Sequence, residues 1–194
     1  MKVKKAIATT SVFGYVIVLL NNKPKGGIDD ARYEKVREGG KVVSKRILVP
    51  VGIDSEDYRD ILGVYVADSE SETSWGELFD DLKQRGLTGV KLVVSDQHKG
   101  LIAAISRYFD GANWQRCVVH YMRNIANSLK RKDRKAFLAV LKKIWEKETA
   151  IETKEYARKL VEQLYPVRQD IAEWLEETVE DTLAIYALPP PSGV

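Results

Sequence analysis

The sequence of 194 residues contains one cysteine, Cys117, and two histidines, His98 and His120. A single cysteine excludes an internal disulfide and fits a protein of the reducing cytoplasm. A structural zinc site uses four ligands, mostly cysteine and histidine, and three such residues fall short of that number. Disulfide-stapled scaffolds are therefore excluded, and we expect a cytoplasmic protein.

The sequence also lacks an apolar run long enough to cross a membrane. The stretch Ala6–Leu20 follows a basic start, as in a signal peptide, but the polar residues Asn21–Lys25 replace the usual small-residue cleavage pattern. It is shorter than the roughly 17–25 residues of a spanning helix. Its β-branched and aromatic residues favour a strand instead. We therefore predict no membrane segment.

Neither sign of charge dominates, because 31 basic and 28 acidic residues leave a net charge of +3. The charged residues are unevenly distributed along the chain. A basic run spans Arg123–Lys143 and an acidic run spans Asp170–Asp181. Each run fits a solvated helix face. Contact with a phosphate backbone is the alternative for the basic run, with these candidate DNA-binding residues: Arg123, Lys130, Arg131, Lys132 and Arg134.

Three strands on short turns are predicted after the breaker cluster at residues 21–27. The first covers Asp30–Glu38 and turns at two glycines into a strand with alternating apolar residues up to Ile53. Pro50 lies inside this second strand and predicts a bulge or missing pairing on one side. The third strand covers Ile61–Ala67. Together they predict an antiparallel meander.

The pattern then changes to alternating helices and strands. A helix with Ser74 as its N-cap ends at Gly86, and an apolar strand follows at Val90–Val94. A second helix has an inner face from Leu101 to Phe109, and a fifth strand is predicted at Trp114–Val119. A meander followed by α/β units indicates a mixed sheet covered by helices.

Beyond the fifth strand only helical patterns remain. One helix carries Phe137, Val140, Leu141 and Ile144, and one or two more extend to Leu183 with a break at Pro166. We predict four regions: an unrelated or frameshifted leader (1–27), an α/β domain (28–119), an all-helical segment (120–188) and a tail (189–194).

Two aspartates are candidates for chemistry. Asp96 follows the fourth strand, where α/β sheets often place ligands, and Asp30 begins the first. If these strands lie side by side and parallel, the two carboxylates converge and suit divalent-metal chemistry on phosphates. The alternatives are that Asp96 caps the next helix and that Asp30 is an exposed strand acid.

Three segments, Asp30–Lys41, Leu92–Leu101 and Trp114–Asn124, resemble the Mutator-type bacterial insertion-sequence transposases. The resemblance implies a DDE enzyme on an RNase H-like fold that cleaves and joins DNA at transposon ends. It also implies that Asp30 and Asp96 bind Mg²⁺ or Mn²⁺, and that the helices form an insertion before a catalytic glutamate.

The chain departs from the family pattern at both ends. The glutamate of the family lies in an Asn-Pro-Leu-Glu-Arg-like segment, which does not occur in this sequence. The leader differs from the family's apolar lead-in to Asp30. We expect a truncated, catalytically incomplete fragment. The alternatives are a non-catalytic module that binds DNA, itself or a full-length transposase, and a remnant whose sheet lacks a proper first strand.

Cys117 and His120 form a Cys-x-x-His pair after the fifth strand. The favoured interpretation is a structural motif that anchors the helical segment by packing and hydrogen bonding. Metal binding and catalytic assistance are the alternatives.

Overall fold

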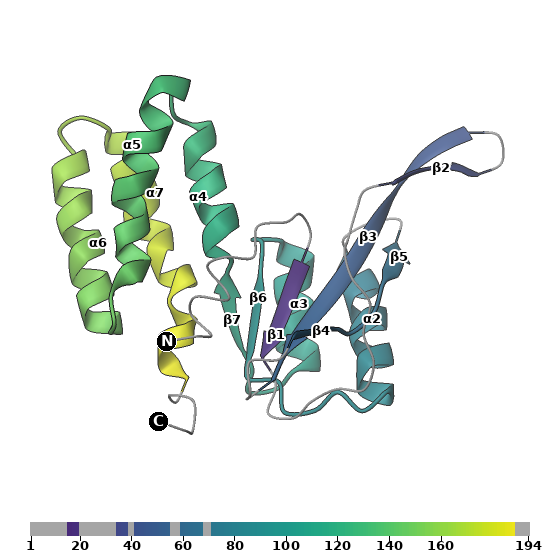
Figure 1. Cartoon of the computed structure of the whole chain (residues 1–194). Helices are drawn as coiled ribbons and strands as arrows, with labels where there is room; N and C mark the ends of the chain where they lie inside the picture. Colours follow the sequence, from purple (N-terminus) through teal and green to yellow (C-terminus); the bar gives the residue numbers. More distant parts are fainter. Residues whose placement is uncertain (1–14, 20–33, 39–40, 55–58, 68–70, 189–194) are drawn as a thin grey trace. The chain divides into compact units, whose positions relative to one another are not determined.

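The computed structural model describes residues 15–19, 34–38, 41–54, 59–67 and 71–188. These residues form two compact units, divided between Cys117 and Val118. This division lies two residues before the boundary expected from the sequence. The first unit contains all the described strands and two helices, and the second unit is helical, as Figure 1 shows.

A mixed sheet forms the first unit. Its strands are β1 (Tyr15–Leu19), β2 (Glu34–Glu38), β3 (Lys41–Ile53), β4 (Arg59–Ile61), β5 (Tyr65–Ala67), β6 (Leu92–Ser95) and β7 (Asn113–Arg116). Paired neighbours follow the order β2-β3-β1-β6-β7, and β4 and β5 also pair with β3. The predicted mixed α/β class is confirmed.

Strand β1 comes from the N-terminal leader and lies between β3 and β6. It runs parallel to β3, with Tyr15 opposite Val49, and antiparallel to β6, with Ile17 opposite Val94. The prediction of a strand in the leader is confirmed. The alternative of a remnant whose sheet lacks a proper first strand is wrong in this respect, because β1 lies between β3 and β6.

Pro50 interrupts the pairing of β3 on one side, as predicted. Strand β5 pairs with Arg46–Leu48 and β4 with Val51–Ile53, both antiparallel. Between them Leu62 donates its N–H to the carbonyl of Pro50 over 2.8 Å. Proline has no N–H to return, so the predicted third strand is split into two short strands at this point.

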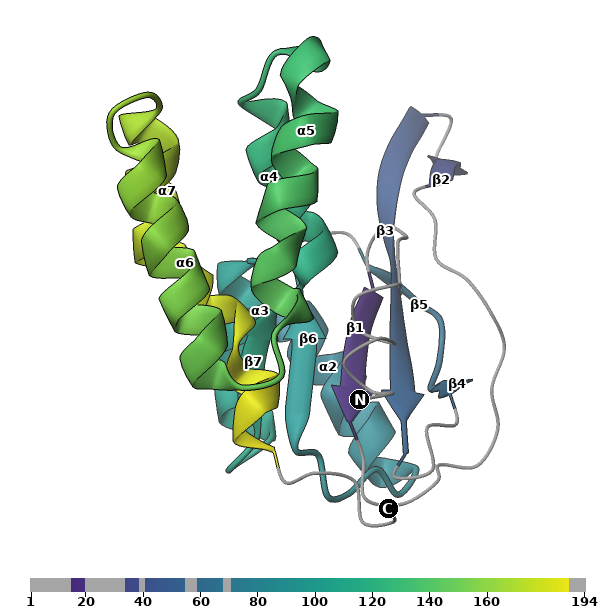
Figure 2. The same cartoon turned by 60° about the vertical axis from the view of Figure 1, so that its left-hand side comes forward.

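Helices α2 (Glu72–Gln84) and α3 (Lys99–Tyr108) lie on the same face of the sheet (Figures 1 and 2). They bury one apolar cluster with Leu48 and Val93 of the sheet. The predicted N-cap of α2 is wrong. Ser71 caps the helix, because its hydroxyl accepts the N–H of Ser74 at 3.1 Å.

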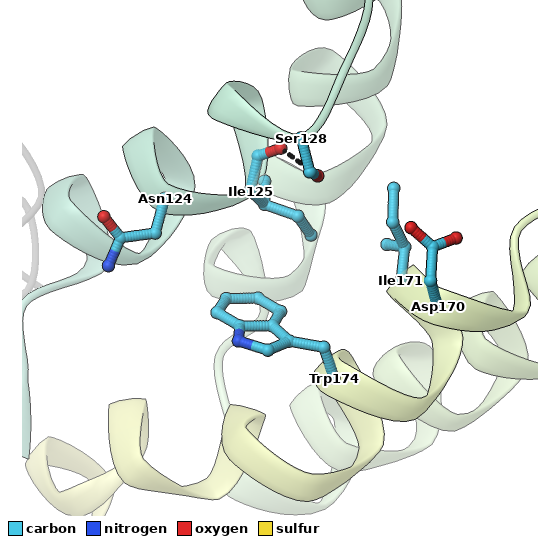
Figure 3. Close-up of a pocket in the computed structure, with 6 residues that line it drawn as sticks. All are labelled: Asn124, Ile125, Ser128, Asp170, Ile171 and Trp174. Atoms are coloured by element: carbon cyan, nitrogen blue, oxygen red, sulfur yellow. Dashed lines mark hydrogen bonds between the residues drawn. The ribbon is translucent and has the colours of Figure 1, made fainter.

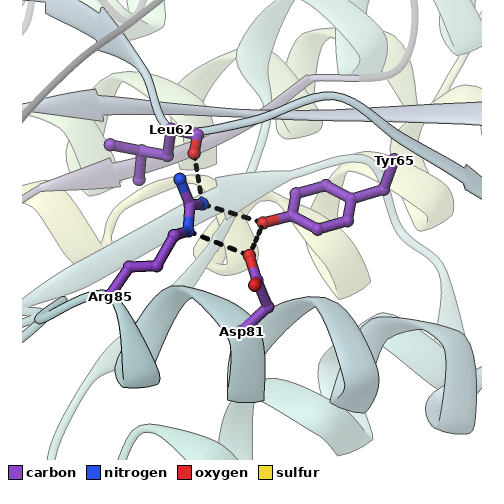
Figure 4. A network of polar contacts seen from close by, with 4 residues as sticks. All are labelled: Leu62, Tyr65, Asp81 and Arg85. Atoms are coloured by element: carbon purple, nitrogen blue, oxygen red, sulfur yellow. Dashed lines mark hydrogen bonds and ion pairs between the residues drawn. The ribbon is translucent and has the colours of Figure 1, made fainter.

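A polar network attaches the C-terminal end of α2 to Tyr65 of β5 and to the loop that precedes this strand (Figure 4). Tyr65 donates its hydroxyl to the carboxylate of Asp81. Arg85 donates to Tyr65 Oη at 2.8 Å, pairs with Asp81 at 2.9 Å and also reaches the carbonyl of Leu62. This network supplements the apolar contacts between helix and sheet.

The second unit consists of α4 (Val118–Asn127), α5 (Arg131–Lys142), α6 (Ala150–Leu164) and α7 (Gln169–Thr178), with short 3-10 helices at Lys143–Glu146, Val179–Thr182 and Ala184–Ala187. The predicted break at Pro166 is confirmed, since this residue lies between α6 and α7. Helix α6 begins with a capping box in which Thr149 and Glu152 exchange hydrogen bonds.

Tyr121 lies at the centre of the helical core and has no exposed surface. Its ring packs 4.2 Å from that of Trp174 and 5.6 Å from that of Trp145. Thr178 donates a 3.0 Å hydrogen bond to the Tyr121 hydroxyl, which satisfies this buried polar group. Val140, predicted on the inner face, is instead 39% exposed.

The predicted fifth strand is too long. β7 ends at Arg116, and Val118 already begins α4. Val118, Tyr121 and Ile125 recur at helical spacing and are all buried, so helix packing overrides the strand preference of the two valines. No helix among the described residues is long and apolar enough to cross a membrane.

Candidate active site

Asp96 follows β6, whose four residues are all buried, and its own side chain is exposed. One carboxylate oxygen, Oδ1, accepts the N–H of Gln97 at 2.8 Å. Its backbone carbonyl accepts the N–H of His98 at 3.0 Å. The buried strand thus presents a carboxylate to solvent from a turn that is fixed by hydrogen bonds.

The carboxylate of Asp96 does not cap α3. The N-cap residue is His98, which makes no side-chain capping bond, and the helix begins at Lys99. Asp96 bonds instead to an N–H before the helix. The interpretation of Asp96 as a helix cap is therefore wrong, and its carboxylate is available for another role.

Ser95 and Trp114 are the residues near Asp96 that sequence reasoning missed. The indole Nε1 of Trp114 donates to Ser95 Oγ at 2.9 Å, and this hydroxyl donates to the carbonyl of Asp96 at 2.9 Å. The bonds join residues 19 positions apart in the sequence. A serine before a strand-end aspartate and a tryptophan on the next strand were the available signals.

The neighbours of β6 are β1, which is antiparallel, and β7, which is parallel. Strand β2, the described part of the predicted first strand, pairs with β3 and is separated from β6 by β3 and β1. The predicted side-by-side pairing of the first and fourth strands is therefore wrong for these residues. Asp30 itself lies outside the described residues.

Cys117 and His120 belong to different elements. Cys117 follows β7, is 7% exposed and donates its backbone N–H to the carbonyl of Ser95 at 2.7 Å. His120 lies in the first turn of α4 and is half-buried. No group of three or more histidine, cysteine or acidic side chains suited to a metal ion occurs among the described residues. The structural role of the pair remains a prediction.

The five candidate DNA-binding residues fall into two groups. Lys130, Arg131 and Lys132 are exposed at the start of α5, where Lys130 is an N-cap without a side-chain hydrogen bond. Arg123 and Arg134 are half-buried, and Arg134 Nε donates to the carbonyl of Leu129 at 3.2 Å. The structure thus brings three cations together at the positive end of a helix dipole.

Glu176 and Glu180, two glutamates of the acidic run, are engaged in the helical unit. Glu176 accepts a 3.0 Å hydrogen bond from the hydroxyl of Tyr165. Glu180 pairs with Lys154 at 2.6 Å. The same run contains Asp170, which forms two bonds with Arg168 that lower the pKa of its carboxyl. Several side chains of the acidic run are therefore engaged by partners within the helical unit.

A pocket of about 180 Å³ lies between α4 and α7 (Figure 3). It is lined by Asn124, Ile125, Ser128, Asp170, Ile171 and Trp174. The Ser128 hydroxyl is turned to the carbonyl of Ile125 at 2.7 Å. Asp170, already paired with Arg168, is the one titratable side chain of the lining, so the pocket offers no acid–base pair.

Comparison with known proteins identifies relatives over most of the chain. The family model described as "Transposase, Mutator family" matches residues 27–192. The transposase for insertion sequence element ISRM5 of Rhizobium meliloti is 42% identical over 160 residues, which cover 82% of this chain and 40% of the relative. The transposase for IS256 in transposon Tn4001 of Staphylococcus aureus is 43% identical over 116 residues, covering 60% and 30%. That for IS1081 of Mycobacterium tuberculosis is 36% identical over 160 residues, covering 82% and 39%.

Proposed function

Because the chain belongs to the Mutator family of transposases, we propose that it acts in DNA transposition as part of a metal-dependent domain that cleaves and joins DNA strands. It spans about 40% of the length of the first relative it matches. The observation that carries the proposal is the exposed carboxylate of Asp96 at the carboxyl end of buried β6, inside the matched residues.

The donor chemistry at Asp96 suits a hard divalent cation. Mg²⁺ and Mn²⁺ bind carboxylate oxygens. Among the described residues, the Asp96 carboxylate is bonded by the N–H of Gln97 at Oδ1, and Oδ2 is open to a ligand. Asp30 lies within the residues that the family model matches, and on that ground we propose it as the second ligand. Metal ions held there would activate the attacking oxygen and stabilise the leaving one.

The sheet supports the proposal of an RNase H-like DDE domain. Antiparallel strands around β3 are followed by the parallel unit β6-α3-β7, and Asp96 lies at the carboxyl end of its first strand. We propose that the third carboxylate, a glutamate, is not among these 194 residues. The engagement of Glu176 and Glu180 within the helical unit supports this view.

Metal binding tests the site directly. Titration with Mn²⁺, followed by electron paramagnetic resonance of the free ion, should give a Kd that rises at least about tenfold in Asp96→Ala and in Asp30→Ala. Asp110→Ala is the matched control, because this exposed aspartate follows α3 at the other end of the helix from Asp96. An unchanged Kd in Asp96→Ala would overturn the proposed site.

A nicking assay tests catalytic completeness. Most of the rate enhancement comes from metal ions that position the reacting groups and stabilise charge. A site with two of its three metal-binding carboxylates should therefore give little activity. The 194-residue protein with Mn²⁺ and supercoiled DNA should therefore show no nicking above that of Asp96→Ala. Nicking by the unsubstituted protein that Asp96→Ala abolishes would contradict this part of the proposal.

DNA binding without cleavage is the second candidate, favoured by the exposed cations that begin α5. Lys130, Arg131 and Lys132 have no ion pair with any described residue and lie at the positive end of the helix dipole. Each phosphate contact contributes about 0.9 to the slope of log K against log salt. Replacing all three by alanine should lower that slope by about 2 to 3 for any DNA sequence.

A matched triple variant on α6 controls for charge alone. Lys154, Arg158 and Lys159 are also exposed, but each already pairs with a glutamate. Their replacement removes the same charge from the same unit and should change the slope by less than about 1. Equal effects of the two triple variants in gel shifts at several salt concentrations would reject the α5 interface.

A further inference from the structure

Both oxygens of Ser95 accept hydrogen bonds, one from β7 and one from the residue that follows β7. The hydroxyl of Ser95 accepts the Trp114 indole N–H at 2.9 Å, and its carbonyl accepts the Cys117 N–H at 2.7 Å. The hydroxyl then donates its own hydrogen to the carbonyl of Asp96 at 2.9 Å. A chain of hydrogen bonds thus runs from Trp114 through Ser95 to the residue proposed to bind metal.

We propose that Trp114 and Ser95 are positioning residues that fix the direction of the Asp96 carboxylate. This inference rests on the proposed role of Asp96. The Asp96 carbonyl accepts two hydrogen bonds, from Ser95 Oγ and from the N–H of His98, and its Oδ1 accepts the N–H of Gln97. Since the carbonyl and the carboxylate belong to one residue in one turn, anchoring the carbonyl restricts where the carboxylate points.

The register of the parallel strands explains why Trp114 reaches Ser95. Trp114 lies opposite Val93 and Arg116 lies opposite Ser95, so the tryptophan is diagonal to the serine on the neighbouring strand. Its ring packs against the apolar cluster that contains Val93. This packing restrains the indole, so the position of the Nε1 donor does not depend on bound metal.

The burial of Ser95 indicates that it positions Asp96 and does not itself contact the substrate. Ser95 is 1% exposed and its hydroxyl is already both donor and acceptor, so it does not meet DNA. It acts through Asp96. Outer groups that orient metal ligands commonly change metal affinity by about 10- to 100-fold when they are removed. We call this chain of hydrogen bonds from Trp114 through Ser95 to Asp96 the relay. Its loss should therefore weaken metal binding.

The test compares two tryptophans that make the same kind of hydrogen bond. Trp114→Phe removes the donor to Ser95, and Ser95→Ala removes the hydroxyl. Trp145→Phe is the control, because Trp145 Nε1 donates to Thr182 Oγ1 at 2.9 Å in the helical unit. We expect the Mn²⁺ Kd to rise about tenfold in the first two variants and less than about twofold in the control.

A double variant and a metal-free readout complete the experiment. If the two residues form one relay, Trp114→Phe combined with Ser95→Ala should weaken Mn²⁺ binding no more than about tenfold, because the effects are not additive. Without metal, the amide resonance of Gln97 should move in Trp114→Phe and Ser95→Ala and stay in Trp145→Phe, since this amide bonds to Asp96 Oδ1.

The outcomes distinguish this inference from the proposed function. If Asp96→Ala leaves Mn²⁺ binding unchanged, the metal site itself is wrong. If Asp96→Ala weakens binding but both Trp114→Phe and Ser95→Ala behave like Trp145→Phe, the relay is wrong and the metal site stands. Should Trp114→Phe fail to fold, as judged by its amide spectrum, Ser95→Ala decides alone.

Discussion

The ring of Tyr108 lies where a side chain on Gly76 would project. A Cβ built on this glycine of α2 would come within 2.6 Å of Tyr108 Oη and 2.9 Å of the ring carbons. Alanine normally stabilises a helix interior by about 1 kcal/mol relative to glycine. Here the half-buried ring, which packs against Phe79, must move aside, so we expect Gly76→Ala to lower the free energy of unfolding by about 1 kcal/mol.

The same substitution in a Tyr108→Ala background is the control. Without the ring, the helix preference of alanine should return, and the added Gly76→Ala should stabilise by up to about 1 kcal/mol. Urea unfolding of the four proteins measures the sign change. Stabilisation by Gly76→Ala in the presence of Tyr108 would show that the contact does not constrain α2.

Tyr65 should make stability sensitive to alkaline pH. Burial, and then the hydrogen bond to Asp81, raise the pKa of Tyr65 to about 12. In the unfolded chain the pKa is near 10, so between about pH 10 and 12 the unfolded state loses a proton that the folded state keeps. The stabilisation by Tyr65 is present below pH 10 and is lost as the pH rises to 12.

Tyr65→Phe isolates this contribution from other groups that titrate at high pH. The difference in free energy of unfolding between the unsubstituted protein and Tyr65→Phe should shrink steadily from about pH 9.5 to pH 12. Urea unfolding at four pH values measures it. A difference that stays constant over this range would contradict the raised pKa and the network in Figure 4.

The elements that were correctly predicted depend on local patterns. The inner faces of α2 and α3 follow from helical spacing, and the interruptions at Pro50 and Pro166 follow from the chemistry of proline. The end of β7 was missed because Val118 has a strand preference that packing in α4 overrides.

The features that could not be predicted from the sequence depend on long-range strand pairing. The apolar leader predicts a strand, but nothing local tells that β1 lies between β3 and β6 or that it runs antiparallel to β6. Asp96 was predicted from its place after a buried strand. The bond from Trp114 to Ser95 was not, because it depends on the register of two strands.

The backbone N–H of Cys117 should hold Ser95 whatever side chain the residue carries. The bond to the Ser95 carbonyl uses the backbone N–H and survives any substitution except proline. We expect Cys117→Ala to lower the free energy of unfolding by about 1 kcal/mol through lost packing, and to leave the Mn²⁺ Kd within about twofold. A larger loss of Mn²⁺ affinity, or zinc that copurifies with the unsubstituted protein and not with Cys117→Ala, would indicate a metal ligand instead.

Strand β1 should hold the first unit together, although residues 1–26 lie outside the family match. Ile17 lies opposite Val51 of β3 and Val94 of β6, so it is paired on both sides. Proline at this position removes an N–H from one ladder and leaves a carbonyl of the neighbouring strand without its partner. We expect Ile17→Pro to destabilise the first unit by about 3 kcal/mol.

Hydrogen exchange followed by NMR can locate this loss. The amides of β6 should exchange much faster in Ile17→Pro, while those of α6 and α7 should keep their rates, because they belong to the other compact unit. Val36→Pro is the control, since the described pairing of β2 is with β3 alone. This change at the far end of the strand order should leave β6 protected. If the β6 amides are equally protected in Ile17→Pro, β1 does not occupy the place between β3 and β6 in solution.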